Sequence, residues 1–213
     1  MKCPLCESRK GKRLCPAKTA QICPVCCGAK REVEIECPSE CAYLHAGREY
    51  ESGRLARTVP PPRRTDRLWE PSFLSSHFQL IAGASQVIAV TRRSFPELAD
   101  SDVQATFESL LRTFNTLDKG IYYDSAPERL IQRELYVALK QFFDGPAEAR
   151  LVSESRPTTH QILDTLQFMK ELSAQITLPR PKSRAYLDHL DGVARSLEKE
   201  QHSESKLIVP TVF

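Results

Sequence analysis

The sequence predicts a mainly α-helical protein in which a small cysteine-rich zinc module precedes a bundle of about five helices. All eight cysteines fall within the first 41 of 213 residues, and apolar residues beyond Trp69 recur at helical spacing. A basic segment with three consecutive prolines, which favours extended chain, separates these regions. The expected organisation is therefore a zinc-binding module (1–51), a basic linker (52–68), a helical bundle domain (69–200) and an apolar tail (201–213).

The position of the cysteines indicates metal binding. The start of the chain lacks the apolar core of a secretory signal, and no run of 18 apolar residues predicts a membrane-spanning helix. We therefore expect a cytoplasmic protein without membrane association. In a reducing compartment, clustered cysteines are typical of metal sites rather than of disulfides.

Two Cys-x2-Cys turns present paired sulfurs, as tetrahedral zinc requires. They are Cys3–Cys6 and Cys23–Cys26, each with a proline after the first cysteine. Residues 31–36 then alternate polar and apolar side chains, which indicates a strand. Pro38 favours a helix start at Cys37, which would place Cys37, Cys41 and His45 along one helix face. This order resembles the treble-clef zinc fold, and the preferred four-ligand site is Cys23, Cys26, Cys37 and Cys41.

A second site is expected because Cys3 and Cys6 then need two more ligands. Cys15, Cys27 and His45 are available, although Cys27 could equally be a buried small residue and the favoured interpretation of His45 is a solvated helix residue. An interleaved, cross-brace pairing fits the same residues. Two zinc ions are expected, with one ion, an Fe–S cluster or disulfides as alternatives. The candidate ligands are Cys3, Cys6, Cys15, Cys23, Cys26, Cys27, Cys37 and Cys41.

One stretch of the module also resembles a known pattern. The segments Cys23-Pro-Val-Cys-Cys-Gly28 and Cys37-Pro-Ser-Glu-Cys41 are similar to the signature of a group of uncharacterised bacterial proteins. The resemblance extends over residues 15–44. It supports a metal site and implies no particular activity.

Apolar spacing and capping residues predict the helices of the bundle in order. The first is expected over 72–91. The second follows a capping box of Ser101 and Gln104, the third follows Ser125–Glu128 and stops at Gly145, and the fourth follows a capping box of Thr158 and Gln161. A last helix is expected over 183–199. A compact bundle is the natural way to bury five apolar stripes.

The sequence does not predict a catalytic centre. The five histidines are scattered, and no metalloprotease, phosphate-loop or nucleophile-elbow motif occurs. His160 with Asp164, and Asp188 with His189 and Asp191, are interpreted as solvated surface. An all-cysteine zinc site is usually closed and structural. We therefore do not expect an enzyme.

Charge and module type suggest two functions. Residues 1–67 carry 14 Lys/Arg and 8 Asp/Glu, a net charge of +6, and residues 68–213 carry a net −3. The basic N-terminal region could bind nucleic acid and support a transcription-regulatory role, although few aromatic residues accompany it. The favoured hypothesis is a protein-interaction adapter or scaffold with a protein partner, in which zinc is structural.

Overall fold

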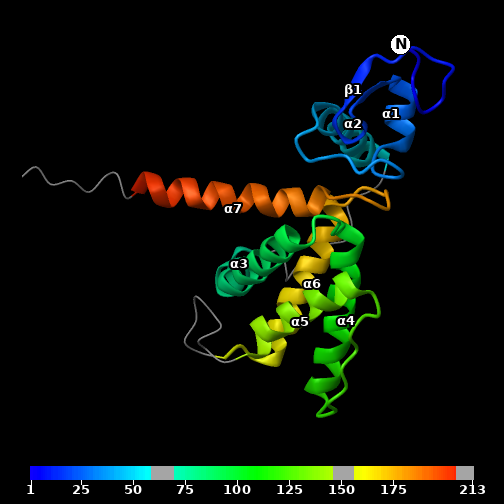
Figure 1. Cartoon of the computed structure of the whole chain (residues 1–213). Coiled ribbons are helices and arrows are strands. Elements are labelled where there is room, and N and C mark those ends of the chain that lie inside the picture. The colour runs from blue at the N-terminus through cyan, green and yellow to red at the C-terminus, as the bar shows by residue number, and fades with distance from the viewer. Residues whose placement is uncertain (59–69, 146–155, 205–213) are drawn as a thin grey trace, which may run out of the picture.

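The computed structural model describes residues 1–58, 70–145 and 156–204. These residues form a mainly helical structure with two short strands, which confirms the predicted fold class (Figure 1). In chain order the elements are β1 (Arg13–Cys15), a 3-10 turn (Pro16–Lys18), β2 (Ala20–Ile22), α1 (Pro24–Lys30), α2 (Ala42–Thr58), α3 (Pro71–Ser94), α4 (Asp100–Asp118), α5 (Leu130–Asp144), α6 (Thr159–Ile176) and α7 (Ala185–Glu204).

The N-terminal module is built on a β-hairpin whose two strands have three residues each. β1 and β2 pair antiparallel, with Arg13 opposite Ile22 and Cys15 opposite Ala20. The turn between them closes at Thr19, whose φ of 47° is left-handed. Just before the hairpin, a Cβ at Gly11 would lie 2.4 Å from the Gln21 carbonyl oxygen, so only glycine allows this close approach.

The predicted five-helix bundle is present as α3 to α7. α4 packs against α5 and α6, while α3 packs against α5, α6 and α7. The periodic apolar residues found in the sequence form one continuous core. Its largest fully buried side chains are Phe107, Phe114, Tyr136, Phe143 and Tyr186.

The capping residues were predicted correctly at one helix and wrongly at another. At α6, the Thr158 hydroxyl accepts a hydrogen bond from the Gln161 amide at 3.2 Å, and the Gln161 side chain accepts one from the Thr158 amide at 2.9 Å. At α4 the Ser101–Gln104 box does not form. The helix begins two residues earlier, with Ala99 as its N-cap residue, and the carboxylate of Asp102 accepts from the Ala99 amide at 3.2 Å.

Several boundaries differ from the expected ones. α2 continues through Thr58, so the first part of the expected linker is helical, and α7 extends to Glu204. Residues 31–36 form a turn closed by a single bridge between Arg31 and Ile35, not a strand. The triple proline of the linker, most of the expected loop at 149–157 and the apolar end of the tail lie outside the described residues.

Within the described residues, α3 is long and apolar enough to cross a membrane by length and composition, and 28% of its most apolar window is buried. Three of its residues, Phe73, Ala84 and Ile88, belong to the bundle core. Core helices of soluble proteins pass the same test. The helix therefore fits a role in the bundle, and the expected absence of a membrane span stays a prediction.

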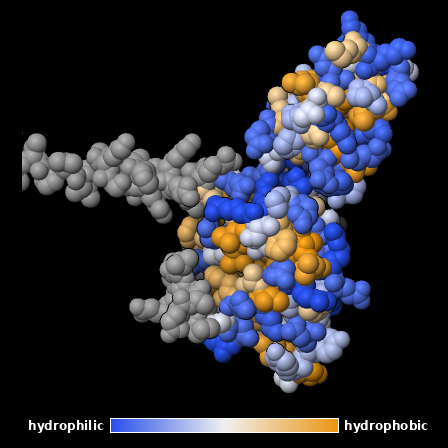
Figure 2. All heavy atoms as spheres, in the orientation of Figure 1, coloured by the Kyte–Doolittle hydropathy of each residue, from blue (hydrophilic) through white to orange (hydrophobic). Residues whose placement is uncertain are grey.

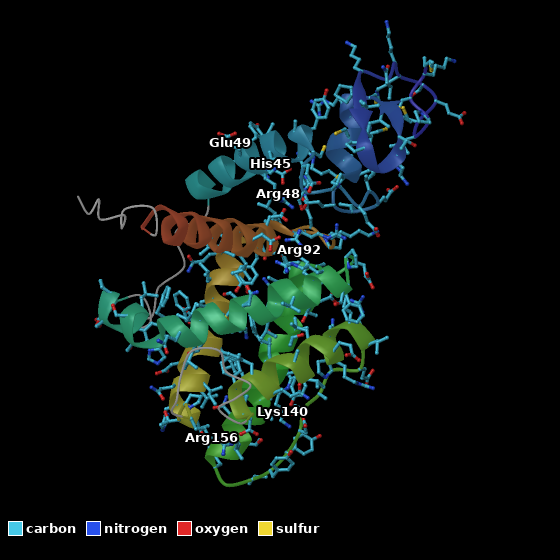
Figure 3. All side chains as sticks on the ribbon, turned by 60° about the vertical axis from the view of Figure 1, so that its left-hand side comes forward. His45, Arg48, Glu49, Arg92, Lys140 and Arg156 are labelled. Atoms are coloured by element: carbon cyan, nitrogen blue, oxygen red, sulfur yellow. The ribbon has the colours of Figure 1, made fainter. Side chains whose placement is uncertain are left out.

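The module lies at one end of the bundle. α7 runs along the side of the bundle that faces the module (Figure 1), and α2 lies on the module side of α7 (Figure 3). The connection that precedes α7 therefore meets both parts of the protein.

Candidate metal centre

Four cysteines of the module are grouped as metal ligands would be. The sulfur atoms of Cys3, Cys6, Cys23 and Cys26 all lie within 4.8 Å of one another. In a zinc tetrathiolate with Zn–S bonds of about 2.3 Å, neighbouring sulfurs are about 3.8 Å apart. The Cys6 and Cys23 sulfurs are already separated by 3.9 Å. The cluster therefore needs only a small contraction to bind one metal ion.

Local structure presents each pair of sulfurs from a tight turn. In the first turn, the Glu7 amide donates to the Cys3 carbonyl at 2.8 Å, and Glu7 is left-handed with a φ of 53°. In the second turn, Cys23 is the N-cap residue of α1, and its sulfur accepts from the Cys26 amide at 3.4 Å. The hairpin β1–β2 joins the turns and places them side by side.

The surroundings of the four thiols favour negative charge on some of them. Hydrogen bonds from the Ser8 hydroxyl and from the Arg9 and Ser8 amides lower the pKa of Cys6 to about 5. Desolvation, together with hydrogen bonds to neighbouring thiols and repulsion by Cys23, raises the pKa of Cys26 to about 12. A bound cation would favour the deprotonated form of all four thiols.

The preferred ligand set from the sequence was wrong in its pairing. Cys23 and Cys26 lie with Cys3 and Cys6, not with Cys37 and Cys41. The expected helix start at Cys37 is also absent, because α2 begins at Ala42. The helical spacing of Cys37 and Cys41 was therefore misleading, and these residues lie in the connection before the helix.

The other four cysteines line a separate small cavity in the module. They are Cys15, Cys27, Cys37 and Cys41, and the cavity walls include the apolar side chains of Ile22, Ile35 and Leu44. Within the described residues, no second set of three such ligand atoms lies as close together as the first four. His45 is exposed and is not among the residues that line this cavity.

A buried ionic network joins the module to the bundle. Arg48 of α2 donates to Glu32 of the module at 2.5 Å and to Asp188 of α7 at 2.6 Å. On the bundle side, Arg92 of α3 donates to Asp188 at 2.5 Å. The Glu32 side chain is only 2% exposed. Figure 3 labels Arg48 on α2 and Arg92 on the other side of α7.

Asp188 therefore has a structural role that the amino-acid sequence did not indicate. It was interpreted as solvated surface, yet its side chain is only 18% exposed. Although desolvation acts in the opposite direction, hydrogen bonds from Arg48, Arg92 and Ser39 hold the pKa of Asp188 below its usual value. His160, by contrast, is 83% exposed, in agreement with the solvated interpretation.

The segment before α7 forms the second half of this junction. Arg180 donates to the Arg31 carbonyl at 2.5 Å and forms an ion pair with Glu51. The Lys182 amide donates to the Glu32 carbonyl at 2.9 Å. Glu32 itself has a left-handed φ of 53°, an uncommon conformation that this set of contacts maintains.

Comparisons with protein-family models, with curated proteins and with solved structures give no match for this chain.

Proposed function

We propose that the chain is a cytoplasmic zinc-binding adapter, in which zinc shapes a recognition module and takes no part in catalysis. The observation that supports this most is the cluster of four thiols, because sulfur ligands favour zinc and four of them leave no open coordination position. We further propose two zinc ions in the module, and the second is argued in the next subsection.

The order of elements around the cluster supports our assignment of the module as a treble-clef finger. A Cys-x2-Cys turn is followed by a hairpin, and the N-terminal turn of a helix supplies the last two ligands. Apart from cysteines, the buried apolar residues of the module are few, chiefly Ile22, Ile35 and Leu44. So small a core does not stabilise a fold alone, so metal binding would supply the missing free energy.

The surface of the protein supports a role in protein contacts. Leu14 and Val25 of the module are 64% and 54% exposed, and Phe78 of α3 is 54% exposed. Hydrophobic residues lie among hydrophilic ones on both parts of the face in Figure 2. Because the ionic network fixes the module against the bundle, these side chains keep a defined relative position. Such a surface suits a protein partner.

Nucleic-acid binding is the alternative, and within the module fewer basic residues are accessible than the sequence suggested. Arg31 is buried, and Lys30 is paired with Glu34 at 2.5 Å, so neither is free to bind phosphate. Five basic residues of the module remain exposed: Lys2, Arg9, Lys10, Lys12 and Lys18.

A comparison of two assays tests the proposal. Affinity capture from cell extract with the full wild-type chain should enrich a protein that a Leu14→Asp, Val25→Asp variant does not capture. The zinc content of the variant, measured in parallel, should equal that of the wild type. Binding to DNA or RNA that weakens steeply between about 50 and 200 mM salt would instead favour the alternative. Enrichment of no protein together with such nucleic-acid binding would refute the adapter role.

A further inference from the structure

We propose that Cys15, Cys27, Cys37 and Cys41 form a second tetrathiolate zinc site, separate from the cluster of Cys3, Cys6, Cys23 and Cys26. These four residues line the same small cavity of the module. The inference rests on the proposed zinc chemistry of the first cluster, but it concerns different ligands and has its own test.

The turn at Cys15 repeats the first ligand turn with one sulfur missing. In both turns a proline follows the cysteine, and the residue four positions after the cysteine is left-handed: Glu7 has a φ of 53° and Thr19 one of 47°. Lys18 occupies the place that Cys6 has in the first turn. The backbone at Cys15 is thus that of a ligand turn that presents a single thiolate.

Cys27 can supply the sulfur that this turn lacks. Adjacent residues of an α-helix project about 100° apart, so Cys26 and Cys27 of α1 cannot serve the same ion easily. Cys26 belongs to the first cluster, whereas Cys27 lines the cavity. The same short helix therefore contributes to both sites, as in interleaved zinc modules. Cys37 and Cys41, which precede α2, complete the set.

The burial of Arg31 beside this cavity indicates that the nearby sulfur atoms carry negative charge. Arg31 is 6% exposed, and its guanidinium donates to the Cys27 sulfur at 3.9 Å. In the described part of the chain, no carboxylate forms an ion pair with Arg31, although a buried cation needs a compensating anion. A zinc ion with four thiolates carries a net charge of −2, so this guanidinium would stabilise it.

Close packing keeps the arginine in place. A Cβ on Gly47 of α2 would lie 1.1 Å from the Arg31 Nη1 atom, so glycine at this position makes room for the guanidinium. Gly53, in the same helix, has no such neighbour within 4 Å. The pair Gly47 and Gly53 therefore offers a matched test of the arginine contact.

Native mass spectrometry of the zinc-loaded full chain tests the second site. We expect two zinc ions per chain, and all eight cysteines should resist alkylation by N-ethylmaleimide. One ion, with alkylation of Cys15, Cys27, Cys37 and Cys41, would refute the second site and leave the first intact. No zinc at all would refute the proposed function as well. A disulfide among these four residues in protein purified under reducing conditions would also overturn the proposal.

Variants then assign each ion to its ligands. Cys41→Ser should lose one ion and keep the first cluster protected from alkylation, and Cys6→Ser should show the reverse. Because a serine variant could unfold the whole module, glycine variants provide a milder test. Gly47→Ala should release one of the two ions about tenfold faster to a chelator, as expected for loss of a charged hydrogen bond, and Gly53→Ala should not. Equal release from Gly47→Ala, Gly53→Ala and wild type would contradict the assigned role of Arg31.

Discussion

Replacing Arg48 by methionine should loosen the junction between the module and the bundle. The side chain of Arg48 is 13% exposed and binds two carboxylates, those of Glu32 and Asp188. Within the described part of the chain, the Glu32 side chain would then keep only a 3.4 Å contact from the Arg184 amide, while Asp188 would keep Arg92 and Ser39. Methionine has similar length and helix propensity, so α2 itself should persist.

The expected cost follows from the burial of the partner that is left. Removing one member of a buried ion pair costs about 3–5 kcal/mol, and the lower end applies because Asp188 remains paired. About 3 kcal/mol corresponds to a more than 100-fold change in an opening equilibrium. The stabilisation lost belongs to docking, so the free energy of unfolding of the bundle itself should change little.

Hydrogen exchange at single amides measures this effect. The Lys182 amide, which donates to the Glu32 carbonyl, should exchange on the order of 100-fold faster in Arg48→Met, if exchange proceeds through opening of the junction. Arg156→Met is the matched control, because Arg156 pairs with Asp144 on the bundle and is 67% exposed (Figure 3). That change should leave exchange at Lys182 unaltered. Exchange at Lys182 that rose less than about threefold in Arg48→Met would refute the reasoning.

Three further predictions concern stability and metal binding. Asp100→Ala should lower the free energy of unfolding by about 3 kcal/mol or more in urea titrations. The reason is that the fully buried Asp100 carboxylate accepts hydrogen bonds from Ser183, Thr177 and the amides at the start of α7. A loss below about 1 kcal/mol would contradict this. Thr158→Ala should cost about 1 kcal/mol in the same assay, since it removes the capping box of α6, and an unchanged midpoint would argue against that cap. Acidification from pH 7 toward 4 should release the metal to a colorimetric indicator, because protons compete with the metal for the thiolates. Even the Cys6 thiol, with its pKa of about 5, becomes protonated in this range. Full retention of the metal at pH 4 would exclude thiolate ligation.

The helices of the bundle could be predicted because their apolar residues repeat at helical spacing along long segments. The stripe from Val103 to Leu117 became α4, and the Thr158–Gln161 pair marked the true start of α6. The capping error at α4 has a local cause. Asp102 lies three residues after Ala99, and its carboxylate accepts from the Ala99 amide, which is the bond that had been expected between Gln104 and the Ser101 amide.

The ligand pairing could not be predicted because it depends on a hairpin with very weak sequence signals. Each strand has three residues, and this brings Cys3 and Cys6 beside Cys23 and Cys26. The spacing of Cys37 and Cys41 fits a helix equally well, but Cys41 ends the connection that leads into α2. The candidate residues were therefore visible in the sequence, whereas their grouping was a property of the fold.

The contacts between the module and the bundle could not be predicted from the sequence, for a different reason. Glu32, Arg48 and Asp188 are charged residues far apart in the sequence, and single charges on helices usually face solvent. The hydrogen bond from Arg48 to Asp188 spans 140 positions. Local pattern carries no information on such a contact, so three residues that hold the two parts together resembled ordinary surface.

The central claim is that metal ligation by the N-terminal thiols creates the fold of the module. Amide spectra of isotope-labelled full chain, recorded before and after removal of zinc by a chelator, test it most directly. We expect the dispersed resonances of residues 1–41 to collapse to random-coil positions, while those of α4, α5 and α6 stay in place. Resonances of the module that kept their dispersion in metal-free protein would contradict the account.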